Sequence, residues 1–138
     1  SLDPSWFETA FRVNVMGVVH VTRGFLPLLR RSSRARILNM SSGAGSIVTK
    51  EDASKYCYGT SKAALNMLTR TLANELKPEG IVVTALSPGW VRTDMGGGEA
   101  DLSVEESVAA ILKTLDSLEE AQAGQFLDRN GQTGVYSW

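Results

Sequence analysis

Several residue types that build common functional sites are scarce in this chain of 138 residues. It has one cysteine, Cys57, and one histidine, His20. These counts exclude an intrachain disulfide framework, a cysteine-rich metal site and any site that needs two histidines, so no metal centre is expected. No apolar run approaches the roughly 18 residues of a membrane span, and no signal peptide is recognised. The sequence therefore predicts a cytoplasmic protein that does not enter a membrane.

Excess charge of either sign is also lacking. The formal net charge is -1, from 14 basic and 15 acidic residues. Such a balance argues against binding to nucleic acid or to an anionic membrane surface. Hydrophobic residues make up 43% of the chain and charged residues 21%, which is ordinary for one globular domain.

Hydrophobic patterning predicts helices that alternate with strands. Helices are expected at about 4–31, at 56–77 and from a capping box of Ser103 and Glu106, and strands at 36–40, 81–86 and 124–128. The fold class is thus α/β, with three helices and three strands in αβαβαβ order around a parallel sheet. We expect the apolar residues of the last helix to face inward, namely Val108, Ile111, Leu112, Leu115 and Leu118.

Tyr58 and Lys62 stand four residues apart in a predicted helix, so both side chains project from one face. A tyrosine has an ordinary pKa of about 10. A positive charge held nearby favours the phenolate and suits the phenol to proton transfer near neutral pH. Tyr56 has no such neighbour, because Thr60 follows it by four residues. The same spacing also occurs in any amphipathic helix with a solvated lysine and a half-buried ring.

Strand ends are expected to bring two further segments to the same place. In open α/β sheets, ligands bind outside the carboxyl ends of the strands. The first strand leads into two serines, of which Ser41 is expected to point into the sheet and Ser42 toward the ligand side. The second strand leads into Pro88 and Gly89. A hydroxyl, the Tyr58 phenol and a Pro-Gly turn should therefore meet, although Ser42 alone could be a simple turn former.

Four motifs follow one another in a recognisable order. They occupy residues 14–17 (Asn-Val-Met-Gly), 39–43 (Asn-Met-Ser-Ser-Gly), 58–62 (Tyr-Gly-Thr-Ser-Lys) and 87–93 (Ser-Pro-Gly-Trp-Val-Arg-Thr). With these motifs the chain resembles the second half of a short-chain dehydrogenase/reductase. The stretch 88–97 is similar to the branch that contains C-factor-like and small carbonyl reductases. The resemblance implies that 1–138 is the C-terminal catalytic half of a Rossmann-like, doubly wound parallel sheet.

The resemblance also implies a reversible hydride transfer between NADP or NAD and the carbonyl or alcohol carbon of a small molecule. Tyr58 would exchange a proton with the substrate oxygen, and Ser42 would polarise it. Lys62 would hold the phenol near its ionised state and bind the nicotinamide ribose, while Asn14 would anchor a water of a proton relay. The cofactor-binding residues implied are Asn39, Tyr58, Lys62, Pro88, Gly89, Val91 and Thr93.

The chain departs from the family pattern at the phosphate-binding turn. No strand, glycine-rich turn and helix precede the first motif, and Gly43-Ala44-Gly45 is followed by Val48 where a third glycine would be needed. The residue that distinguishes NAD from NADP would lie in the N-terminal, nucleotide-binding half of the family fold. Two hypotheses follow: the catalytic half of an oxidoreductase, or a non-catalytic fragment that serves as a dimerisation or regulatory module.

Partner and loop expectations follow from the same resemblance. An uncovered flank of the first strand is prone to pair with another chain. We therefore expect a homo-oligomer through helices 4–31 and 56–77. The glycines of 96–98 suit either a mobile substrate lid or an exposed flexible loop.

Overall fold

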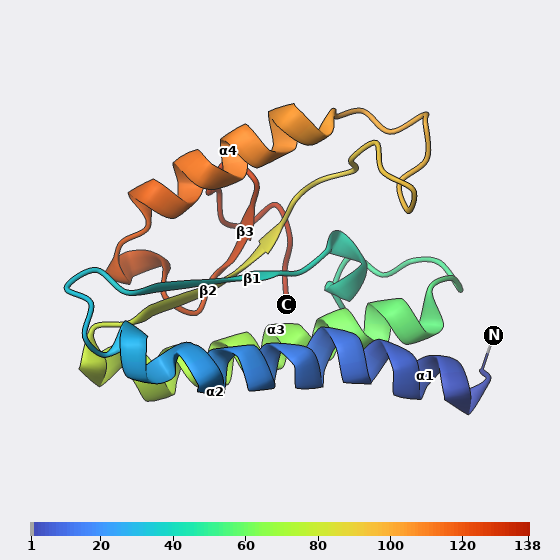
Figure 1. Ribbon diagram of the computed structural model, residues 1–138. Coiled ribbons are helices and arrows are strands. Elements are labelled where there is room, and N and C mark those ends of the chain that lie inside the picture. Colours follow the sequence, from blue (N-terminus) through green and yellow to red (C-terminus); the bar gives the residue numbers. More distant parts are fainter. Residues whose placement is uncertain (1) are drawn as a thin grey trace.

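A sheet between two helical layers makes up the structure, a computed structural model that describes residues 2–138 (Figure 1). The helices are α1 (Pro4–Phe11), α2 (Gly17–Leu29), α3 (Tyr56–Leu76) and α4 (Val104–Ser117). The strands are β1 (Arg36–Met40), β2 (Val82–Ser87) and β3 (Phe126–Asp128). The predicted α/β class and alternation are confirmed. Within residues 2–138, no helix has the length and hydropathy of a membrane-spanning segment.

The three strands form a parallel sheet in the order β1-β2-β3. Arg36 pairs with Val82, and Ala85 pairs with Phe126. Every residue of the central strand β2 is buried, as its nearly continuous apolar sequence predicts for a strand covered on both faces. In the described sheet β1 pairs with β2 alone, so β1 is an edge strand.

Each face of the sheet carries its own hydrophobic cluster. On one face Ile81 and Val83 pack with Leu76 of α3 and with partly buried leucines of α2. On the other face Val82 and Leu127 pack with Leu118, just after α4. Burying one such side chain contributes about 1.5–3 kcal/mol, so these two clusters hold the helices on opposite faces of the sheet.

The first helical segment differs from the uninterrupted α-helix expected at 4–31. Asp3 caps it as predicted, accepting a hydrogen bond from the Ser5 amide at 2.9 Å. Residues Arg12–Met16 then form a π-helical turn, and α2 ends at Leu29. A π-turn accommodates an extra residue within a helix. It shifts the face that Asn14 presents relative to an ideal α-helix.

The expectation that Val108 and Leu112 face inward is wrong. These side chains are 46% and 55% exposed, whereas Ser107 and Thr114 are buried. Both small residues satisfy main-chain oxygens: Ser107 donates to Pro88 at 2.9 Å and Thr114 donates to Arg129 at 2.8 Å. Close approach of α4 to these loops therefore requires short side chains with hydroxyl groups, and that requirement overrides the hydrophobic periodicity.

Candidate functional site

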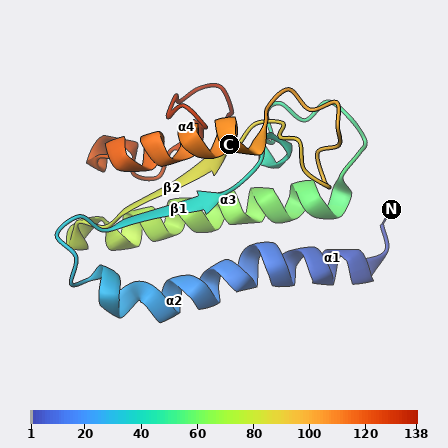
Figure 2. The same ribbon diagram turned by 45° about the horizontal axis from the view of Figure 1, so that its top comes forward.

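The carboxyl ends of β1 and β2 and the N-terminal end of α3 lie at the same end of the molecule (Figures 1 and 2). A cavity of about 610 Å³ opens there. Six of the residues predicted to bind substrate or cofactor line it, namely Ser42, Tyr58, Pro88, Gly89, Val91 and Thr93. The other three predicted residues do not line the cavity. Asn14 contacts Ser61 and Lys62 contacts Met40, next to the lining, whereas Asn39 contacts Thr69. The fold thus brings three distant segments of the chain to one cavity.

The two serines after β1 have different surroundings. Ser41 is 2% exposed, and its hydroxyl donates to the Asn66 side-chain oxygen at 2.5 Å. Ser42 is half-buried and accepts a hydrogen bond from the Ala44 amide at 3.2 Å. The Ser42 hydroxyl therefore keeps its own proton available to a molecule in the cavity, while that of Ser41 fastens the strand end to α3.

Lys62 is buried behind the ring of Tyr58. Its ammonium nitrogen lies 5.6 Å from the ring centroid and donates to the main-chain oxygen of Met40 at 2.8 Å. The residue is 9% exposed, and this desolvation lowers the pKa of its ammonium below 10.5. A cation is thereby held between α3 and the end of β1, next to the phenol.

Asn14 supports the helical turn that carries Tyr58. Its amide donates to the Ser61 hydroxyl at 2.9 Å, and this hydroxyl donates to the Tyr58 main-chain oxygen at 2.8 Å. The π-turn in the first helical segment places Asn14 beside α3 for this contact. Asn14 is thus linked to Tyr58 through Ser61.

Asn39 is not brought to the cavity. Its buried amide donates to the Thr69 hydroxyl at 2.9 Å, which ties β1 to α3. The residue borders a different hollow of about 600 Å³ between α2 and the open side of β1. The sequence motif alone does not reveal that the Asn39 amide donates its hydrogen bond to a residue of α3.

The glycine-containing loop after β2 is held by its own hydrogen bonds. The Trp90 indole nitrogen donates to the Gly96 oxygen at 2.8 Å, and the Gly97 amide donates to the Thr93 oxygen at 2.9 Å. The Thr93 hydroxyl also accepts from the Gly96 amide at 3.1 Å. These bonds fold residues 93–97 into a turn beside the cavity, while the expected role as a mobile lid or a flexible loop stays a prediction.

The segment before α3 contains a residue that sequence reasoning missed. Lys55 lines the cavity and has the left-handed backbone angles φ 56° and ψ 38°. It is the one residue other than glycine with positive φ in the described part of the chain. Its position three residues before Tyr58 is the signal that could have identified it.

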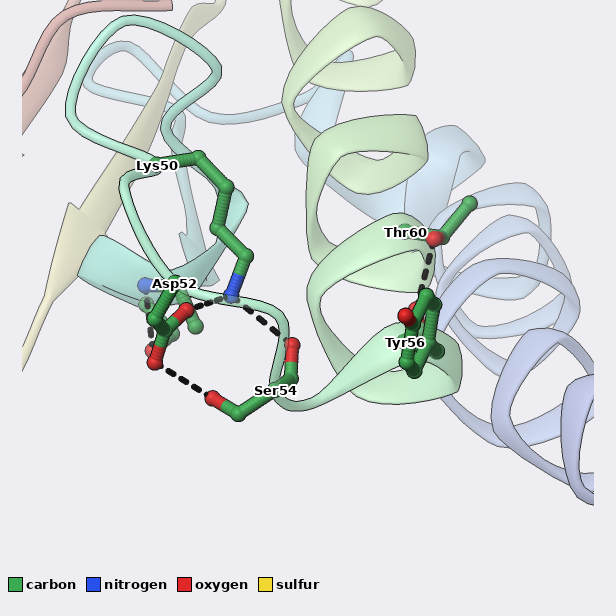
Figure 3. Close-up of polar contacts among 7 residues, drawn as sticks. Lys50, Asp52, Ser54, Tyr56 and Thr60 are labelled. Atoms are coloured by element: carbon green, nitrogen blue, oxygen red, sulfur yellow. Dashed lines mark hydrogen bonds and ion pairs between the residues drawn. The ribbon is translucent and has the colours of Figure 1, made fainter. Parts of the chain in front are cut away.

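Lys50, earlier in that segment, has different contacts (Figure 3). Its ammonium is paired with the Asp52 carboxylate and donates to the Ser54 main-chain oxygen at 2.8 Å. The Ser54 hydroxyl donates to Asp52 at 2.6 Å. Hydrogen bonding from Lys50 and then from Ser54 lowers the pKa of Asp52 to about 2. This network joins residues 50–54 to one another, and it does not include Lys55.

Comparison with known proteins places these features in a family. Residues 1–102 match the family model for short chain dehydrogenase. C-signal of Myxococcus xanthus is 41% identical over 130 residues, which cover 94% of this chain and 78% of that protein.

Two solved carbonyl reductases have similar structures. Carbonyl reductase Sniffer of D. melanogaster has a TM-score of 0.93 and 34% identity, covering 100% of this chain and 59% of the other. The NADPH-bound carbonyl reductase from chicken fatty liver has a TM-score of 0.88 and 36% identity, covering 100% and 58%. The chain therefore spans somewhat more than half the length of these structures.

Proposed function

The chain belongs to the short-chain dehydrogenase family, and from that premise we propose that it carries the catalytic half of an NAD(P)-dependent oxidoreductase acting on a carbonyl or alcohol carbon. One observation carries the proposal: Tyr58 and Ser42 line a common cavity, and the Lys62 ammonium lies 5.6 Å from the Tyr58 ring centroid. A proton donor, a polarising hydroxyl and a fixed cation are groups that assist hydride transfer from a reduced nicotinamide to a carbonyl carbon.

The cavity wall near Gly89 supports binding of the nicotinamide end of such a cofactor. Gly89 has φ 83°, and a Cβ there would lie 2.9 Å from a Leu102 side-chain carbon and 3.3 Å from an Arg129 nitrogen. Glycine thus permits the positive-φ turn that packs against Leu102 and Arg129, and this turn places Pro88, Val91 and Thr93 in the cavity lining. The fit is limited to this end, because the chain has no glycine-rich phosphate turn.

In this proposal the bound nicotinamide supplies or accepts the hydride. Tyr58 gives its phenolic proton to the substrate oxygen during reduction and takes a proton from the alcohol during oxidation. Ser42 donates a hydrogen bond to the same oxygen and stabilises the charge that develops on it. Lys62 places a positive charge next to the phenol, and Asn14 steadies the turn of α3 through Ser61.

A comparison of two tyrosine variants tests the proposal. Oxidation of NADPH or NADH by the chain is measured with a panel of ketones and aldehydes. Tyr58→Phe should lower kcat by about 10²–10⁴, the range of one general acid–base group. Tyr56→Phe, two residues earlier on the same helix, is the matched control and should stay close to the parent rate. Equal effects of the two variants would contradict the role of Tyr58.

A second candidate function is supported by the open side of the sheet. The edge of β1 faces the hollow of about 600 Å³ that Val21 and Phe25 line, and these two side chains are 62% and 58% exposed. Unpaired strand edges and exposed apolar surface favour association. In this reading the chain is a non-catalytic module that assembles with a second copy of itself, including through the predicted helices 4–31 and 56–77.

Sedimentation of the purified chain separates the two candidates. Association without nucleotide binding or turnover would favour the second, and Phe25→Asp should then shift the equilibrium toward monomer. A chain that oxidises NADPH with the tyrosine dependence described above supports the first. A stable monomer at low micromolar concentration would contradict the assembly proposal.

A further inference from the structure

The cavity is mostly apolar but has one charged side chain in its lining. Much of its lining consists of large hydrophobic residues from the loop after β2 and from α4, namely Trp90, Val91, Met95, Val104, Val108 and Ile111. Within residues 2–138, Lys55 is the one lining residue with a charged side chain, and no carboxylate of this part of the chain lines the cavity. A single cation in a mostly apolar lining is a selective arrangement, because it favours a ligand with an anionic end and an apolar body.

The Lys55 ammonium is available for such a ligand. Among residues 2–138, the ion pairs join other groups: Arg30 with Glu79, Lys50 with Asp52 and Arg92 with Glu106. None of these carboxylates is paired with Lys55, and the nearby lysine of the same loop is neutralised by Asp52 (Figure 3).

The start of α3 adds to the positive potential. Lys55 is the N-cap residue of α3, and its side chain does not cap the helix. The amides of the first turn of a helix carry partial positive charge. The buried ammonium of Lys62 lies one turn beyond Tyr58 on the same helix. An anion near Lys55 would thus meet attractive charge from the side chain and from the helix.

We propose that the substrate of this site is an apolar carbonyl compound that carries a carboxylate or a similar anion, and that Lys55 is the residue that selects it. The inference rests on the proposed oxidoreductase function and deepens it by naming the substrate class. Lys55 and Tyr58 line the same cavity, so an anion paired with Lys55 shares that cavity with the carbonyl group that Tyr58 would protonate. The apolar body then lies against Val108 and Met95.

Benzoylpropionate and its methyl ester test this inference, since they share an aromatic body and a ketone and differ in one charge. The measured quantity is the ratio of kcat/KM for the acid to that for the ester. Lys55→Asn removes the ammonium and keeps a residue that tolerates left-handed backbone angles, so the variant should fold. It should lower the acid value about tenfold or more, as expected for one charge-assisted hydrogen bond, and leave the ester value within about twofold.

Two further variants act as controls. Lys55→Arg keeps the charge and should retain the preference for the acid. Lys77→Gln removes one positive charge at the opposite, exposed end of α3. It should leave kcat/KM unchanged for both the acid and the ester. Equal losses for acid and ester in Lys55→Asn would overturn the inference, and so would weaker NADPH binding with an unchanged ratio, because Lys55 would then serve the cofactor phosphate.

A binding measurement separates failure of this inference from failure of the proposed function. If the chain shows no turnover, calorimetric titration with the two ligands still reports the preference. Tighter binding of benzoylpropionate than of its ester, lost in Lys55→Asn, would support an anion-selective apolar site even though hydride transfer fails. Equal affinity for the two ligands, or binding of neither, would overturn the inference.

Discussion

The ammonium of Lys62 donates its hydrogen bond to the main-chain oxygen of Met40 at 2.8 Å while lying 5.6 Å from the ring centroid of Tyr58. One contact anchors the cation to the end of β1, and the other places its charge beside the phenol. The position of Tyr58 relative to the sheet therefore depends on the same lysine that would assist its chemistry.

Burial of Lys62 predicts a pH-dependent stability. Desolvation lowers the pKa of Lys62 below the 10.5 of the unfolded chain. Between the lowered pKa and 10.5 the unfolded chain binds more protons, so the free energy of unfolding should rise with pH across that window. Lys62→Met should remove this rise and lose oxidoreductase activity. Chemical denaturation of both proteins from pH 7 to 11 measures the difference, and parallel curves would contradict the prediction.

The serines after β1 should respond in opposite ways. Ser42→Ala should lower kcat/KM by about 10²–10³, as loss of one oxyanion donor does, and should cost less stability than Ser41→Ala, because only the partly buried Ala44 amide loses its acceptor. Ser41→Ala leaves the buried Asn66 oxygen without its donor and should lower the free energy of unfolding by about 1–3 kcal/mol. Kinetics and thermal unfolding of both variants check the pattern, and catalytic loss centred on Ser41 would reverse our assignment.

Two buried threonines offer a matched test of polar burial. The Thr84 hydroxyl in β2 has no hydrogen-bond partner within the described structure, and its residue is 0% exposed. Thr84→Val should therefore raise the free energy of unfolding by about 1 kcal/mol. Thr69 accepts from Asn39 and donates to Leu65 at 2.8 Å, so Thr69→Val should lower it by about 1–3 kcal/mol. Urea denaturation measures both changes, and destabilisation by Thr84→Val would contradict the first.

Close packing of the turn after β1 predicts a strong response at Gly45. A Cβ there would lie 2.8 Å from Lys62 Cβ and from the Lys62 main-chain carbon. Gly45→Ala should force the turn away from α3, cost about 1–3 kcal/mol and reduce activity by displacing Ser42. Gly24→Ala is the control, because that helical site has open space around it, and it should stabilise the chain by about 0.5–1 kcal/mol. Equal stability of the two variants would show that the turn yields freely.

Much of the fold follows from local sequence. The apolar run of β2, the Asp3 cap and the Ser103–Glu106 capping box each use interactions between near neighbours, so the alternation of helices and strands can be predicted from them. The spacing of Tyr58 and Lys62 is local in the same sense. The choice of Ser42 over Ser41 agrees with strand alternation, a period that the backbone imposes.

Tertiary structure decided which side chains remain free to act. Asn39 is drawn to Thr69 and Asn14 to Ser61, in each case by a residue more than 25 positions away. The outward position of Val108 and the place of Lys55 in the cavity depend on how α4 and the loop before α3 dock. The amino-acid sequence by itself determined the elements and the spacing of the proposed proton-transfer pair, because those depend on contacts within one turn or strand. The cavity around that pair depends on packing between distant segments, which no local pattern encodes.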